Sequence, residues 1–154
     1  MKYEPLFIDD FCSASLKADS ALDALTQIAT LGYENNLVAQ SWLAAVTQRE
    51  QDFPTGLPTA VPVAIPHTDS IHVKQDGIGY FRLTQPVEFG EMGSLENKIK
   101  VSVIIPLLIT NPKDQTSLLM SVIALVQDFE FMNQLILLDS KTQVANFLNE
   151  KLKN

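Results

Sequence analysis

Residues 53–69 read "FPTGLPTAVPVAIPHTD", a segment that runs from a proline-rich loop into an apolar stretch and ends just after a histidine. Three prolines and one glycine within residues 53–62 exclude a long helix and indicate a loop. The apolar residues of 61–65 then alternate in the manner of a β-strand. The segment therefore predicts a strand that presents His67 at its end, where α/β folds place their chemistry.

Two segments after this one are also predicted to be extended. The stretch "GIGYFRL" at 77–83 alternates imperfectly, and "KVSVII" at 100–105 is a nearly continuous apolar run. A run of that kind is typical of a strand that is buried on both faces. Pro106 cannot donate to a sheet ladder, so we expect this strand to end or bend there.

Helices are predicted both before and after these strands along the sequence. Ser20 and Asp23 form a cap pair for a helix over 20–33, and helical spacing predicts a second helix over 36–50. In the last third, Pro112 follows a capping asparagine at the start of a third helix. A shorter helix is expected over 129–138, and a capping box, Ser140 with Gln143, begins the last one.

This order of elements indicates an α/β sandwich, with a mixed sheet covered by helices on both sides. The chain of 154 residues has a globular composition, 46% hydrophobic and 19% charged. We find no repeat, low-complexity tract or linker, so residues 1–154 are expected to form a single domain.

Composition and charge limit which partners and which cellular compartment we expect for the protein. The net charge of −7 provides no basic footprint for nucleic acid, so none is expected as a partner. No apolar run reaches the roughly 18 residues of a membrane span, and the N-terminus lacks an apolar signal core. The single cysteine, Cys12, fits a reducing compartment. We expect a cytoplasmic protein that does not insert into the membrane.

His67 is the first candidate for chemistry. Pro66 stiffens the approach to it, and the polar residues Thr68, Asp69 and Ser70 follow. A neutral imidazole is well populated near neutral pH and can form a covalent intermediate, such as a phosphohistidine. A semi-buried structural histidine at a strand end fits the pattern equally well.

Arg49 is the second candidate, 18 positions before His67 and at the end of the second predicted helix. Its guanidinium is a rigid fork suited to phosphate or carboxylate oxygens. A salt bridge with Glu50, or a cation at a helix C-terminus, explains the residue as well.

A metal site made of His67, Asp69 and His72 is a weaker alternative, because their spacing matches no strong zinc pattern. The glycines have neither the P-loop nor the dinucleotide-binding spacing. We therefore expect no metal and no cofactor.

Arg49-Glu50 followed by residues 53–69 resembles the active-site signature of the fructose/mannitol-type (type 2) enzyme IIA domains of the bacterial sugar phosphotransferase system. The "IPHT" ending and residues 70–94, "SIHVKQDGIGYFRLTQPVEFGEMGS", look most like the galactitol-type branch. The similarity continues to residues 128–149, "DFEFMNQLILLDSKTQVANFLN".

The resemblance implies a phosphotransferase that acts as a phosphohistidine relay in sugar transport, with a mixed sheet of about five strands. His67 would accept the phosphoryl group from the carrier protein HPr and pass it to a cysteine of a IIB subunit, which serves a IIC membrane channel. Arg49 would stabilise the charge of the phosphoryl group. Thr68 and His72 are expected as supporting residues, and the "VEFGEMGS" loop as part of an apolar rim, with Phe89 or Met92.

The chain departs from the family pattern in one place. Many fructose- and mannitol-type members carry a second active-site histidine before a long helix, where this chain has "NPKDQTSLLM" at 111–120. Gln115 is the nearest counterpart, and its amide can donate to phosphate but cannot carry a proton or a positive charge.

Two other functions remain open from the sequence. One is a regulatory IIA-like protein whose phosphorylation state controls partner binding, as in the nitrogen-regulatory relatives. The other is a metal-dependent hydrolase that uses the three residues named above as ligands.

Overall fold

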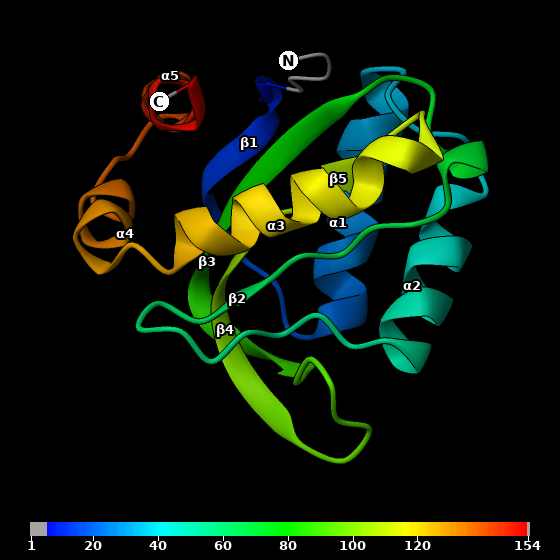
Figure 1. The fold of residues 1–154 in the computed structure, drawn as a ribbon, viewed down its shortest axis with the longest axis horizontal. Helices are drawn as coiled ribbons and strands as arrows, with labels where there is room; N and C mark the ends of the chain where they lie inside the picture. The colour runs from blue at the N-terminus through cyan, green and yellow to red at the C-terminus, as the bar shows by residue number, and fades with distance from the viewer. Residues whose placement is uncertain (1–5, 154) are drawn as a thin grey trace.

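The computed structural model describes residues 6–153, in which a sheet of five strands lies between two layers of helices (Figure 1). The strands are β1 (Phe7–Leu16), β2 (Val63–Ala64), β3 (Gly77–Gly90), β4 (Lys98–Ile104) and β5 (Leu107–Leu108). Their order is β1-β3-β4-β2, and β5 pairs with β3 off this path. β1–β3 and β2–β4 are parallel pairs, whereas β4 and β5 each run antiparallel to β3. The predicted α/β sandwich with a mixed sheet of about five strands is confirmed.

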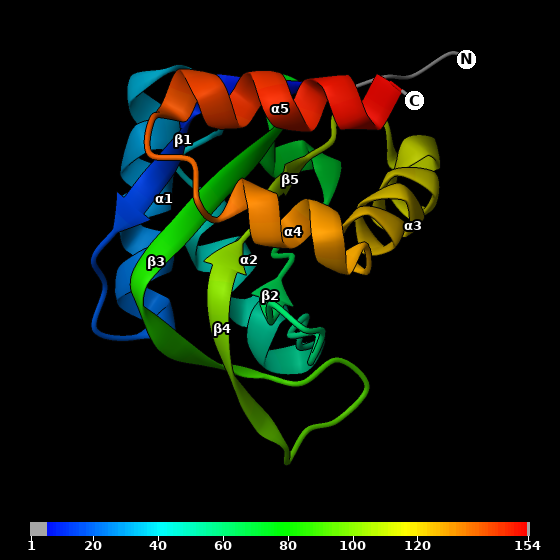
Figure 2. The ribbon, with the colours of Figure 1, turned by 90° about the vertical axis from the view of Figure 1, so that its left-hand side faces the viewer.

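The helices divide between the two faces of the sheet. One apolar cluster joins it to α1 (Ala21–Glu34) and α2 (Trp42–Asp52), and the other joins it to α3 (Gln115–Val126), α4 (Phe129–Leu135) and α5 (Lys141–Lys153). Two short 3-10 helices, η1 (Ser70–His72) and η2 (Pro112–Asp114), lie in the connections. Figure 2 shows α5 crossing β1, where the Asn149 amide bonds both the N–H and the C=O of Phe7, at 2.7 and 3.1 Å. No helix of the described chain could cross a membrane.

β4 shows why the run at 100–105 is almost continuously apolar. Val101 and Ile104 pack with α1 and α2, whereas Val103 and Ile105 pack with the helices of the opposite face. All four side chains are fully buried, so β4 and the residue that follows it supply both cores.

Most predicted helices are found, and the predicted capping side chains make their hydrogen bonds, but Asn111 caps the 3-10 helix η2, and α3 begins only at Gln115 instead of at Pro112. Ser20 Oγ accepts from Asp23 N at 3.0 Å, Asn111 Oδ1 accepts from Lys113 N at 3.1 Å, and Ser140 Oγ accepts from Gln143 N at 3.1 Å. The helix predicted from residue 36 was wrong at its start, since α2 begins at Trp42. Asn36 is left-handed, with φ 56°, and ends the preceding helix instead.

Gly56 links the loop before β2 to the hairpin of β3 and β4. Its N–H donates to Gly90 O at 2.9 Å, and its carbonyl accepts from Met92 N at 2.8 Å. A Cβ at position 56 would lie 2.5 Å from Gly90 O, which belongs to the backbone and cannot rotate away. The glycine of the "PTG" sequence is therefore required by close packing of two backbones.

We predict that Gly56→Ala lowers the free energy of unfolding by about 1–3 kcal/mol, because the added methyl overpacks this contact. Chemical denaturation monitored by circular dichroism measures the change. Ala60→Ser is the control, because residue 60 is exposed in the same loop. A Gly56→Ala variant as stable as this control would contradict the packing argument.

Candidate functional site

His67 lies just beyond the end of β2, and backbone hydrogen bonds hold the segment that carries it. Ile105 N donates to Ala64 O at 2.8 Å, and Leu107 N donates to Pro66 O at 3.0 Å. The segment from β2 to Pro66 is thus hydrogen-bonded to the stretch that runs from β4 into β5, as far as the residue before His67. The strand end predicted from the sequence does position this histidine.

The His67 imidazole is held in one tautomer by its own backbone. Nδ1 lies 2.8 Å from the carbonyl oxygen of Ile65. Because a carbonyl can only accept, Nδ1 carries the proton in the neutral ring and Nε2 keeps its lone pair. Burial lowers the pKa of His67 most, the Ile65 bond raises it and the positive charge of Arg49 lowers it. At neutral pH the ring is therefore neutral, with a nucleophilic Nε2.

His67 is largely enclosed, with 6% of its surface exposed. The buried side-chain nitrogen and oxygen atoms without a partner in residues 6–153 are Trp42 Nε1, Thr47 Oγ1, Arg49 Nε and Tyr80 OH. Nε2 of His67 makes no hydrogen bond in this part of the chain and is not one of these atoms, so it reaches the surface. A reagent has to approach that one edge of the ring.

Arg49 approaches the same segment from the last turns of α2. Its Nη1 lies 3.5 Å from Asp69 Oδ1, and its guanidinium carbon lies 5.5 Å from the centre of the Phe53 ring. The salt bridge with Glu50 that the sequence allowed is not the one that forms. Nε is buried without a hydrogen-bond partner among the described residues, whereas the side chain as a whole is 33% exposed, so an anion can reach the guanidinium from its exposed side.

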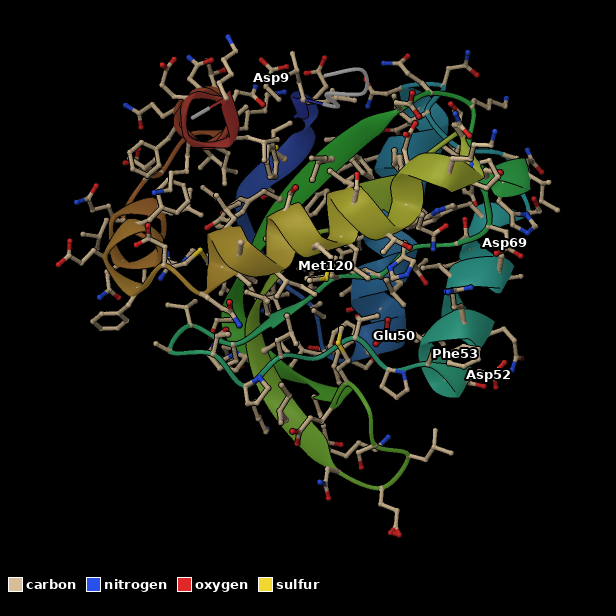
Figure 3. The ribbon with its side chains drawn as sticks, in the orientation of Figure 1. Asp9, Glu50, Asp52, Phe53, Asp69 and Met120 are labelled. Atoms are coloured by element: carbon tan, nitrogen blue, oxygen red, sulfur yellow. The ribbon has the colours of Figure 1, made fainter. Side chains whose placement is uncertain are left out.

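Glu50, beside Arg49 on the helix, bonds Thr55. In Figure 3, Glu50 points from α2 toward the interior of the molecule, whereas Asp52 points outward. Burial raises the pKa of the Glu50 carboxyl, and its bonds with the backbone and side chain of Thr55 lower it. The Glu50 carboxylate is thus hydrogen-bonded to the loop that leads to His67.

The supporting residues are placed in three different ways. Thr68 is buried beside His67, and its hydroxyl donates to Asp69 O at 2.9 Å. His72 ends η1, and its Nδ1 lies 2.7 Å from Ser41 Oγ, next to the first residue of α2. Gln115 is the half-buried first residue of α3, and its side chain makes no hydrogen bond within the described chain. Their participation in the chemistry stays a prediction.

The proposed metal ligands point to different partners. His67 bonds Ile65, Asp69 pairs with Arg49 and His72 bonds Ser41. Across residues 6–153, no three potential ligands are grouped closely enough to hold an ion. This geometry gives the hydrolase alternative no ligand set in the described chain.

The predicted apolar rim was wrong for Phe89, which is 2% exposed and belongs to the core with α1 and α2. Met92 is half-buried, and its N–H bonds Gly56 O at 2.8 Å. Two exposed apolar residues that we did not predict flank the site, Phe53 at 64% and Ile71 at 80%. Phe53 opens the "FPTG" stretch, so its position before the loop was the available signal.

The model of the family described as phosphoenolpyruvate-dependent sugar phosphotransferase system, EIIA 2, matches residues 6–151. The chain belongs to this family. A galactitol-specific EIIA component from Escherichia coli (strain K12) is 31% identical over 129 residues, which are 83% of this chain and 85% of the relative. This EIIA domain is therefore of the galactitol-like branch, and it is a phosphocarrier of a sugar phosphotransferase system.

Solved structures share the fold of this EIIA domain. A putative PTS IIA (PtxA) from Streptococcus mutans has a TM-score of 0.77 at 21% identity, covering 96% of this chain and 95% of that one. The mannitol enzyme IIA of Escherichia coli, in its complex with phosphorylated enzyme IIB, has a TM-score of 0.72 at 19% identity, covering 90% and 94%. At these identities the likeness establishes the arrangement of the elements.

We predict that the imidazole of His67 titrates below its ordinary value of about 6.5, so it stays neutral at pH 7. Arg49→Gln should raise this pKa, because it removes a positive charge that disfavours the imidazolium. A pH titration of the ring signals by NMR measures both effects. A midpoint above 6.5, or one that falls in Arg49→Gln, would contradict the electrostatics described here.

Proposed function

We propose that Nε2 of His67 is the atom that carries the phosphoryl group. The observation that supports this most is the bond from Nδ1 to Ile65 O, which leaves Nε2 as the free nucleophile. The neighbouring Arg49 supplies a partly exposed guanidinium, as an anion site requires. His67 and Arg49 thus take the roles that the sequence suggested for them.

The donor is phospho-HPr, and the transfer exchanges one N–P bond for another. The lone pair of Nε2 attacks phosphorus in line, and the electron pair of the breaking bond returns to the imidazole of the donor. The proton on Nδ1 stays in place, where the Ile65 carbonyl stabilises the positive charge that the ring acquires. The group then passes to a cysteine of a IIB subunit by the same kind of displacement.

Arg49 offsets the charge of the phosphoryl group, which brings roughly two negative charges. In the unphosphorylated protein its Nη1 faces Asp69, whose side chain is 76% exposed. An exposed pair of this kind contributes little, so the guanidinium can turn from Asp69 to the phosphoryl oxygens at small cost. Thr68 and Gln115 are supporting donors in this proposal.

The partners follow from the relay. The mannitol enzyme IIA was solved in a complex with phosphorylated enzyme IIB, which supports a IIB subunit as the acceptor for this chain. HPr is the donor, and the IIC channel is reached through IIB. The exposed Phe53 and Ile71 beside the site suit a docking surface for both proteins. The chain works in the cytoplasm as a single domain over residues 1–154.

The transport role is favoured over the regulatory one by the similarity to a galactitol-specific component. We therefore propose that this subunit serves the uptake of a sugar or sugar alcohol of that kind. The sugar itself is recognised by the membrane partner.

We predict that His67→Ala accepts no phosphoryl group when it is incubated with enzyme I, HPr and phosphoenolpyruvate. The wild-type protein should acquire an acid-labile, base-stable phosphate under these conditions, as a phosphohistidine does. His72→Ala is the matched control and should still become labelled. Label retained by His67→Ala would overturn the assignment.

We also predict that Arg49→Ala slows phosphoryl transfer roughly 100-fold, because a donor to the transferring group is lost. Arg82→Ala removes the other arginine of the chain and should leave the rate within about twofold. Rapid-quench kinetics with phospho-HPr measure the rates, and thermal unfolding measures stability. Equal losses of stability and rate in Arg49→Ala would assign Arg49 to the fold instead.

A further inference from the structure

A chain of hydrogen bonds, partly buried at Glu50 and buried at Ile65 and His67, connects the last turn of α2 to the imidazole of His67. Glu50 Oε2 accepts from Thr55 N at 2.8 Å, and Glu50 Oε1 accepts from Thr55 Oγ1 at 2.9 Å. Thr55 Oγ1 in turn accepts from Ile65 N at 2.9 Å. The carbonyl of Ile65 then accepts from His67 Nδ1 at 2.8 Å. Four residues from two separate segments are thus joined end to end.

With Glu50 ionised, the direction of every bond in this chain is fixed. A backbone N–H can only donate, so the hydroxyl oxygen of Thr55 must accept from Ile65. The hydroxyl proton is then directed at Glu50, and both donors of Thr55 meet the same carboxylate. A hydroxyl at position 55 is required, because one atom has to accept and donate at once. A carboxylate is required at position 50, because two donors have to be received.

Burial makes the loss of any one of these hydrogen-bond partners costly. Thr55 is 4% exposed and Ile65 is fully buried, so solvent cannot substitute for a missing partner. Removal of the Thr55 hydroxyl would leave Ile65 N–H unpaired at the point where the chain enters the site. The segment would gain freedom there, only two residues before His67.

We propose that Glu50 and Thr55 are positioning residues for phosphoryl transfer, which hold the Ile65 carbonyl where it selects the Nδ1–H tautomer of His67. The pair acts only through Ile65 and does not touch the reacting atoms. Glu50 and Arg49 are consecutive residues of α2, so one helix end sets both the tautomer of the imidazole and the position of the guanidinium. The proposal rests on His67 Nε2 as the phosphoryl acceptor.

Substitutions at position 55 provide a matched pair. Thr55→Val removes the hydroxyl at nearly constant volume, whereas Thr55→Ser keeps it. Thr59→Val is the control, because the Thr59 hydroxyl donates to Val61 O at 2.8 Å in the same loop and lies outside the chain of bonds. Glu50→Gln is an independent variant, since only one of its two terminal atoms can accept.

Two measurements separate positioning from a general structural role. Long-range ¹H–¹⁵N NMR reports which imidazole nitrogen of His67 carries the proton at pH 7, and single-turnover transfer from phospho-HPr gives the rate and the half-saturating donor concentration. We expect wild type, Thr55→Ser and Thr59→Val to keep the Nδ1–H tautomer and similar rates. Thr55→Val and Glu50→Gln should show a mixture of tautomers and transfer about 10- to 100-fold more slowly at saturating donor. Their half-saturating concentrations should stay within about twofold, because docking is unchanged.

The proposal is overturned if wild-type His67 carries its proton on Nε2, whatever the variants do. It is also overturned if Thr55→Val keeps both the Nδ1–H tautomer and the wild-type rate, or if Thr59→Val slows transfer as much as Thr55→Val. Should Thr55→Val fail to fold, a Glu50→Gln variant with the wild-type tautomer and rate overturns it equally. Failure of the wild-type protein to accept phosphate would instead refute the acceptor role of His67, while the tautomer comparison still decides the positioning role.

Discussion

The hydrogen bond from His67 Nδ1 to the Ile65 carbonyl constrains everything else at the site. A neutral imidazole has one proton and one lone pair, so the nitrogen that donates decides which nitrogen can react. Here the donor faces the backbone at 2.8 Å and Nε2 is left for chemistry. The strand pairing that fixes Ile65, and the loop that fixes its N–H, are useful to function because they hold this carbonyl in place.

Burial of His67 has two opposite effects on a phosphocarrier. It keeps the ring neutral, because desolvation lowers the pKa of the imidazole, and it restricts a partner to the exposed edge. Arg49 adds to the first effect and prepares the site for an anion. A ring that is kept unprotonated beside a cation is suited to receive a phosphoryl group and to release it again. Little covalent machinery is needed beyond this arrangement.

Much of the fold could be predicted from local patterns, but not the strand that begins it. The run at 100–105 and the helix caps follow from periodicity and capping chemistry. β1 was missed because register shifts between Phe7 and Cys12, and between Ser13 and Leu16, interrupt its alternation. Its buried residues therefore do not follow the period of two on which a strand prediction depends.

The candidate site, too, could be predicted only in part. His67 and Arg49 were identified from their types and their setting, because proline, loop and guanidinium chemistry can be recognised in sequence. The partners of Arg49 and Glu50 could not be, since the sequence allowed these two neighbours to pair with each other. In the structure, Arg49 pairs with Asp69, 20 positions later, and Glu50 is hydrogen-bonded to Thr55, which lies just beyond the end of α2. Which partner each of these side chains meets depends on the path of the chain after α2.

The end of α2 has a consequence for how this protein can change during evolution. Successive residues of a helix are rotated by about 100°, so insertion or deletion of one residue inside α2 would reorient everything that follows it. Arg49 and Glu50 face different parts of the site, and both would be misdirected at once. Length variation in this family should therefore accumulate in surface connections such as the tip of the β3–β4 hairpin, while the last turns of α2 keep a fixed register with the loop that follows.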